Sequence, residues 1–91
     1  MKMAEKFESV FDAIAVSPEE ALNMKLRASL IREIRAKVSD AGWTQEKTAQ
    51  KLGITQPRVS DLLSGKLSKF SLDALVNILA RLGSDVKLKV A

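Results

Sequence analysis

Cysteine, histidine and tyrosine are all absent from this 91-residue sequence. Without cysteine there can be no disulfide, and without cysteine or histidine the chain lacks the two ligands that structural zinc sites use most. It also has no thiol nucleophile and no general base poised near neutral pH, and its carboxylates are scattered. We therefore expect no metal, no other cofactor and no enzymatic activity.

Long apolar runs are also missing. None approaches the roughly 20 residues that a membrane-spanning helix needs, and the amino terminus lacks the apolar stretch of a signal peptide. We expect a cytoplasmic protein that makes no membrane contact. Hydrophobic residues make up 46% of the chain, which at this length predicts one folded domain with a modest core.

The charge is unevenly distributed along the chain. Residues 1–20 hold two basic and five acidic side chains, a net charge of −3. Because the whole chain carries +4, residues 21–91 carry a net charge of +7. Clustered basic charge favours a polyanionic partner such as DNA, and a basic solvated face without such a partner is the alternative.

Residues 44–66 have the pattern of two short helices joined by a tight turn. Thr44 is a typical N-cap, Ala49 is small enough to let a second helix approach, and Gly53 can adopt the left-handed backbone of the turn. Apolar residues at four positions would hold the pair on a core: Leu52, Ile54, Val59 and Leu62. This spacing predicts a helix-turn-helix unit.

The same stretch resembles the phage-repressor (Xre) helix-turn-helix family. The likeness rests on Thr44-Gln45, Ala49, Leu52-Gly53-Ile54, the run from Thr55 to Ser60, and Gly65-Lys66. Two further runs, Phe70 to Asp73 and Asp85 to Val90, resemble the small branch that holds HigA-type antitoxins. The resemblance implies an all-α, lambda-repressor-like domain that binds operator DNA as a homodimer, often beside a toxin that it neutralises. If residues 84–91 paired between two subunits, the reader helices would lie about one turn of DNA, roughly 34 Å, apart, which predicts a palindromic operator.

The second helix, near residues 55–63, is the expected reader of DNA bases, with either Thr55 or Gln56 as its N-cap. The candidates for base contacts lie on the flank that faces away from the core: Gln56, Pro57, Arg58, Ser60 and Asp61. Gln56 could pair with adenine and Arg58 with guanine, each good contact giving about 1 to 3 kcal/mol of discrimination. Pro57 would touch a thymine methyl group. Asp61 could accept from cytosine or, as we favour, orient Arg58 from one helical turn away.

A second set of residues is expected to hold the DNA backbone. Thr44 and Gln45 open the first helix, where unpaired amides and a partial positive charge suit a phosphate, and the resemblance implies that Gln45 also braces Gln56. The loop after the reader helix has hydroxyls, a glycine and lysines that could straddle a phosphate. The full set is Thr44, Gln45, Thr55, Gly65, Lys66, Ser68 and Lys69. Plain surface or turn chemistry is the alternative for these residues.

The predicted organisation has three parts: an amphipathic segment at 1–16, the DNA-binding domain at 17–83 and a short β-strand at 84–91. Ser17 and Pro18 predict the start of a long helix that ends before Gly42, and Ser71 should cap a last helix that Gly83 ends. Segment 1–16 could dock on its own domain or bind a basic partner. Residues 84–91 alternate with strand period and could pair with a second subunit, a partner chain or residues near the amino terminus.

Taken together, these features predict a DNA-binding repressor. We expect the antitoxin of a type II toxin–antitoxin pair, which represses its own operon and neutralises a small basic ribonuclease toxin. Two alternatives stay open. One is a protein-interaction module that acts mainly by neutralising a partner, and the other is a phage or prophage regulator without a toxin.

Overall fold

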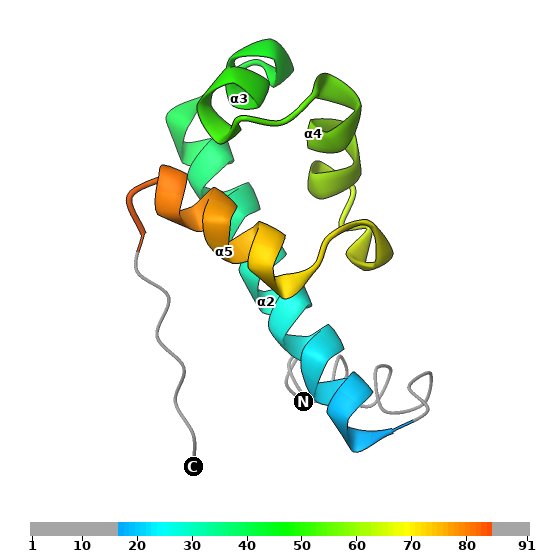
Figure 1. Cartoon of the computed structure of the whole chain (residues 1–91). Coiled ribbons are helices and arrows are strands. Elements are labelled where there is room, and N and C mark those ends of the chain that lie inside the picture. Colours follow the sequence, from blue (N-terminus) through cyan, green and yellow to red (C-terminus); the bar gives the residue numbers. More distant parts are fainter. Residues whose placement is uncertain (1–16, 85–91) are drawn as a thin grey trace, which may run out of the picture.

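The computed structural model describes residues 17–84, which form four α-helices and one short 3-10 helix (Figure 1). These elements are α2 (Pro18–Ala41), α3 (Gln45–Leu52), α4 (Gln56–Leu63), η1 (Leu67–Lys69) and α5 (Leu72–Arg81). The predicted all-α class is confirmed for this part of the chain. The amphipathic segment predicted at 1–16 and the strand predicted at 84–91, apart from Ser84, lie outside the described residues.

Every α-helix in residues 17–84 begins at a serine or threonine whose hydroxyl oxygen accepts the amide hydrogen three residues on. The hydroxyl-to-amide distances are 3.0 Å for Ser17, 3.1 Å for Thr44, 3.4 Å for Thr55 and 3.2 Å for Ser71. Such caps satisfy backbone donors that the first helical turn leaves without a partner. The predicted helix starts are therefore confirmed, and Thr55, not Gln56, caps α4.

Glycines with left-handed backbone angles end the first two helices. Gly42 follows α2 with φ +68°, and Gly53 follows α3 with φ +69°. At the second of these turns the amides of Gly53 and Ile54 both donate to the carbonyl of Ala49, at 2.9 and 3.1 Å. This pairing closes α3 and sends the chain directly into α4, as the sequence predicted for Gly53.

The core lies between α2, α5 and the α3–α4 pair. Its buried cluster consists of Ile31, Ile34, Val38, Leu52, Leu62, Phe70, Leu75, Ile78 and Leu79. Val59 is also fully buried, and Ile54 packs half-buried against the cluster, so the four apolar positions predicted to hold the helix pair do so. Figure 1 shows α5 crossing α2 on one side of the α3–α4 pair.

Thr48 is the buried polar residue that sequence reasoning did not anticipate. Its side chain has no exposed surface, and its hydroxyl donates to the carbonyl of Thr44 at 2.8 Å. A buried hydroxyl without such a partner would destabilise the fold.

Within residues 17–84, no helix combines the length and the apolar character that crossing a bilayer requires.

Candidate nucleic-acid interface

The turn between α3 and α4 lies against a side chain of the last helix. A Cβ atom added at Gly53 would lie 2.8 Å from Cζ of Arg81, so the guanidinium of α5 rests directly against the turn. Val59 and Leu62 fix the inner side of α4 in the core, with no exposed surface. With one side buried, the opposite side of this eight-residue helix must face solvent.

The residues predicted to read bases divide by exposure. Gln56, Pro57 and Ser60 are exposed, whereas Arg58 and Asp61 are half-buried. Gln56 also lines a shallow groove between α3 and the start of α4, together with Gln50 and Thr55. In the described part of the chain no hydrogen bond joins Gln45 to Gln56, so the bracing contact that the resemblance implied is not formed.

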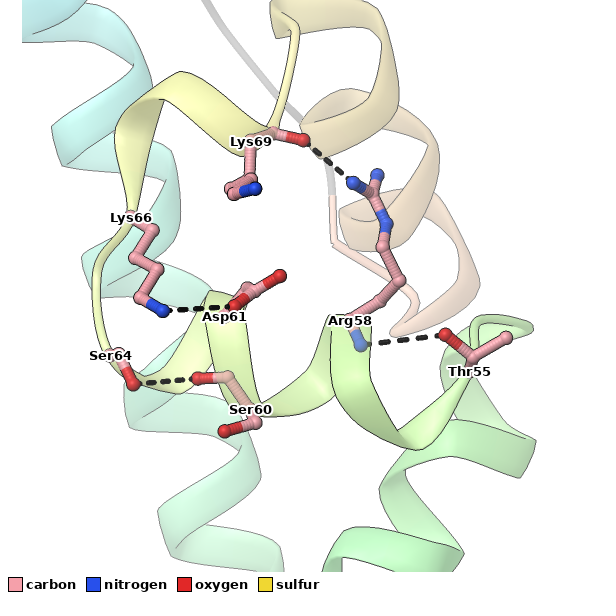
Figure 2. Close-up of polar contacts among 7 residues, drawn as sticks. All are labelled: Thr55, Arg58, Ser60, Asp61, Ser64, Lys66 and Lys69. Carbon is pink, nitrogen blue, oxygen red and sulfur yellow. Dashed lines mark hydrogen bonds and ion pairs between the residues drawn. The ribbon is translucent and has the colours of Figure 1, made fainter.

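The guanidinium of Arg58 is directed at the following loop, as Figure 2 shows. Its Nη1 donates to the carbonyl of Lys69 at 2.7 Å, and its Cζ lies 4.2 Å from the centroid of the Phe70 ring. A hydrogen bond from a charged donor and a cation–π contact both stabilise this position. Arg58 is thus engaged by its own domain, and the base contact predicted for it stays a prediction.

Asp61 does not orient Arg58, contrary to our expectation. Its Oδ1 lies 3.3 Å from Nζ of Lys66, and Figure 2 shows this ion pair on the side of α4 that faces the loop. Lys66 lies beyond the end of the helix, where the chain has turned back toward Asp61, and its own amide donates to the carbonyl of Asp61 at 3.1 Å. The pair is partly solvated, with exposed side-chain fractions of 56% for Lys66 and 23% for Asp61, so it contributes little to stability.

The predicted phosphate-binding residues of the loop are brought together around η1. Lys66, Ser68 and Lys69 are exposed, and Gly65 is half-buried with φ +73°. The amide of Gly65 donates to the carbonyl of Leu62 at 3.1 Å, so this donor is already used within the loop. The lysine ammonium groups and the Ser68 hydroxyl are therefore the groups best suited to bind an anion here.

The helix starts bring the remaining phosphate-binding candidates to the surface. Thr44, Gln45 and Thr55 are all exposed. A threonine hydroxyl that accepts a capping bond still carries a proton, so Thr44 and Thr55 can donate to an approaching anion. The first turns of α3 and α4 add the partial positive charge of a helix N-terminus.

Arg27 is a residue of this region that sequence reasoning missed. It lies on α2, and its Nη1 donates to the carbonyls of Leu67 at 2.8 Å and Phe70 at 3.4 Å. Its Nε is buried and has no hydrogen-bond partner. Because its partners lie 40 and 43 residues away, no local pattern in the sequence indicates this contact.

Two further arginines of α2 lie beside the loop. Arg32 and Arg35, both exposed, line a hollow of about 300 Å³ that also includes Ser64, Gly65 and Leu67. The basic surface next to α4 therefore extends from Lys66 and Lys69 onto α2.

Two short helices joined at a left-handed glycine, with a polar exposed side on the second, define a helix-turn-helix unit, a class in which the second helix commonly enters DNA. The chain belongs to a family of helix-turn-helix domains, since the family model with that description matches residues 10–91. No curated protein matches the sequence. Family membership points to a DNA-binding regulator.

Proposed function

We propose that this protein is a sequence-specific, DNA-binding transcriptional repressor that places α4 in the major groove. The observation that carries the proposal is the division of α4 into a fully buried side and an exposed polar side. Val59 and Leu62 fix the first, and Gln56, Pro57 and Ser60 form the second. A major groove about 12 Å wide admits a helix of about 10 to 12 Å diameter.

Base reading and backbone binding fall to different parts of this surface. Gln56, Pro57 and Ser60 would contact base edges from the first two turns of α4, with Asp61 at the margin. The phosphates on either side would be held by the starts of α3 and α4, through Thr44, Gln45 and Thr55, and by the loop with Gly65, Lys66, Ser68 and Lys69. Contacts of the second kind fix the register of the protein on the duplex without specifying sequence.

We further propose that the repressor acts as a homodimer on a palindromic operator. What supports this is the small size of a single unit, because α4 has eight residues and offers only a few base contacts. Two copies related by a two-fold axis would double those contacts. Their reader helices would then lie about one turn of DNA, roughly 34 Å, apart.

The finer proposal is that this repressor is a cytoplasmic antitoxin of HigA type. The sequence resemblance supports it, and so does the contrast between the acidic residues 1–20 and the basic remainder of the chain. An acidic segment suits a small basic ribonuclease toxin by charge complementarity. Co-expression with the gene next to its own would test this, because the toxin chain should then co-purify at a fixed ratio.

DNA binding is tested by selecting duplexes from a library with a random central stretch, followed by titration of the selected duplex and an unrelated one. For both duplexes the logarithm of the binding constant should fall linearly with the logarithm of the salt concentration, with a slope of about −0.9 for each phosphate contacted. The selected duplex should keep an advantage of at least about 10³. Equal affinity for the two duplexes at every salt concentration would show that the protein binds DNA through its basic surface without recognising sequence. That result would contradict the proposal.

A further inference from the structure

Two arginines from different helices hold the same short stretch of backbone. Arg27 of α2 reaches the carbonyls of Leu67 and Phe70, and Arg58 of α4 reaches the carbonyl between them, that of Lys69. The three carbonyls belong to η1 and the residue that follows it. The loop is therefore fixed from both sides by charged donors.

The backbone of η1 makes few hydrogen bonds of its own. η1 has three residues, and its own backbone bonds are those from Lys69 to Lys66 at 3.1 Å and from Phe70 to Leu67 at 3.2 Å. The carbonyls of Lys69 and Phe70 have no partner within this turn, so outside donors must satisfy them, whereas the carbonyl of Leu67 also accepts from the amide of Phe70. The arginine bonds at 2.7 and 2.8 Å are the shortest made to this stretch, and donors that carry charge bind more strongly than neutral ones.

Reading a base through Nη1 would require Arg58 to leave these contacts. It would lose the bond to Lys69 and the face of the Phe70 ring, and Phe70 itself is a core residue with 2% of its surface exposed. The Phe70 ring therefore cannot follow the guanidinium outward. A base contact made in this way would be weakened in proportion to the fraction of molecules in which Arg58 is released.

We propose that Arg58 and Arg27 are positioning residues of the DNA interface. They hold the loop so that Lys66, Ser68 and Lys69 meet the phosphates, and Arg58 does not read a base. Sequence discrimination then falls to Gln56, Pro57 and Ser60, with Asp61 at the margin. This inference rests on the proposed DNA-binding function, and its test separates the two.

The first part of the test uses the free protein. Amide hydrogen exchange, followed by NMR, should show the protection of Lys69 and Phe70 falling about tenfold in Arg58→Ala, while the amides of α2 keep theirs. Arg35→Ala is the matched control, because it removes an exposed arginine near the loop that donates to none of these carbonyls. Arg27→Lys provides a second variant that should loosen the same amides. Unchanged loop protection in both Arg58→Ala and Arg27→Lys would overturn the proposal.

The second part uses DNA, with a duplex selected from a random library and an unrelated duplex. Arg58→Ala should weaken both by the same factor, about tenfold, so that the ratio of the two affinities stays within about twofold. Arg58→Lys should recover part of this loss, because lysine can donate to the carbonyl but lacks the flat guanidinium that stacks on Phe70. A ratio that falls by more than about fivefold in Arg58→Ala would indicate a base contact and overturn the proposal.

A direct spectroscopic readout completes the test. The Arg58 Hε resonance should carry the ring-current shift of Phe70 in the free protein and keep it when either duplex is bound. Loss of that shift on the selected duplex would mean that Arg58 leaves the ring to read a base, and would overturn the proposal. If the wild-type chain bound neither duplex, the proposed function would fail, while the exchange data would still decide whether the arginines hold the loop.

Discussion

Replacing Gly53 by alanine should lower the free energy of unfolding by about 1 to 2 kcal/mol, the typical cost of a side chain in the left-handed region. Gly53 has φ +69°, and it lies at the turn that sets the angle between α3 and α4. A Cβ atom there would also come within 2.8 Å of Cζ of Arg81. The guanidinium is the end of a flexible side chain on the surface, so it can move aside at little cost.

Gly42→Ala is the matched control for this prediction. Gly42 has nearly the same backbone angle, φ +68°, but an added Cβ would meet no atom within 4 Å. The backbone strain is therefore shared, and the difference between the two variants isolates the contact with Arg81. We expect that difference to be below about 0.5 kcal/mol, and a double-mutant cycle with Arg81→Ala should give a coupling of the same small size.

Thermal and urea unfolding followed by circular dichroism provide the measurement. For a domain of this size, 1 kcal/mol corresponds to a shift of about 4 to 8 °C in Tm, so both alanine variants should melt well below the wild type. A Gly53→Ala protein that melts at the wild-type temperature would refute the strain argument. A loss for Gly53→Ala that exceeds the loss for Gly42→Ala by about 2 kcal/mol or more would show instead that Arg81 cannot move, and that α5 fixes the turn rigidly.

Three further substitutions test other parts of the molecule. Gln56→Ala should reduce discrimination between selected and unrelated duplexes by about 1 to 3 kcal/mol, whereas Asn77→Ala on the exposed side of α5 should leave it unchanged. Lys66→Ala should weaken binding to both duplexes equally and reduce the salt slope by about 0.9; a change in their ratio would contradict a phosphate role. Thr48→Val removes a fully buried hydroxyl donor and should lower the free energy of unfolding, measured in urea, by about 1 kcal/mol. An unchanged free energy would mean that the bond to Thr44 contributes nothing to stability.

The helix boundaries could be predicted from the sequence because they depend on local chemistry. A serine or threonine hydroxyl caps the amide three residues on, and a glycine adopts the left-handed angle that stops a helix. These effects act within one helical turn, so Ser17, Thr44, Ser71 and Gly53 could each be assigned from neighbouring residues alone. The same reasoning placed Val59 and Leu62 in the core, because the spacing of apolar residues fixes which side of α4 turns inward.

Side-chain directions at the candidate interface could not be predicted in the same way. The sequence places Arg58 on the flank of α4, but the choice between the groove and the loop depends on where Phe70 and the carbonyl of Lys69 lie in the fold. The contact of Arg27 joins residues 40 positions apart. Asp61 turns to Lys66 because the chain reverses after the helix ends, where the rule of partners three or four residues apart no longer holds.

Both α3 and α4 have a threonine as their N-cap, although an aspartate would cap a helix equally well. A carboxylate at Thr44 or Thr55 would sit where a phosphate oxygen is expected, and two negative charges about 4 Å apart repel by about 1 kcal/mol even in water. An uncharged cap closes the helix and leaves the positive end of its dipole available to a polyanion. Because a hydroxyl does not titrate in the range where carboxylates do, mild acid cannot remove these caps by protonation.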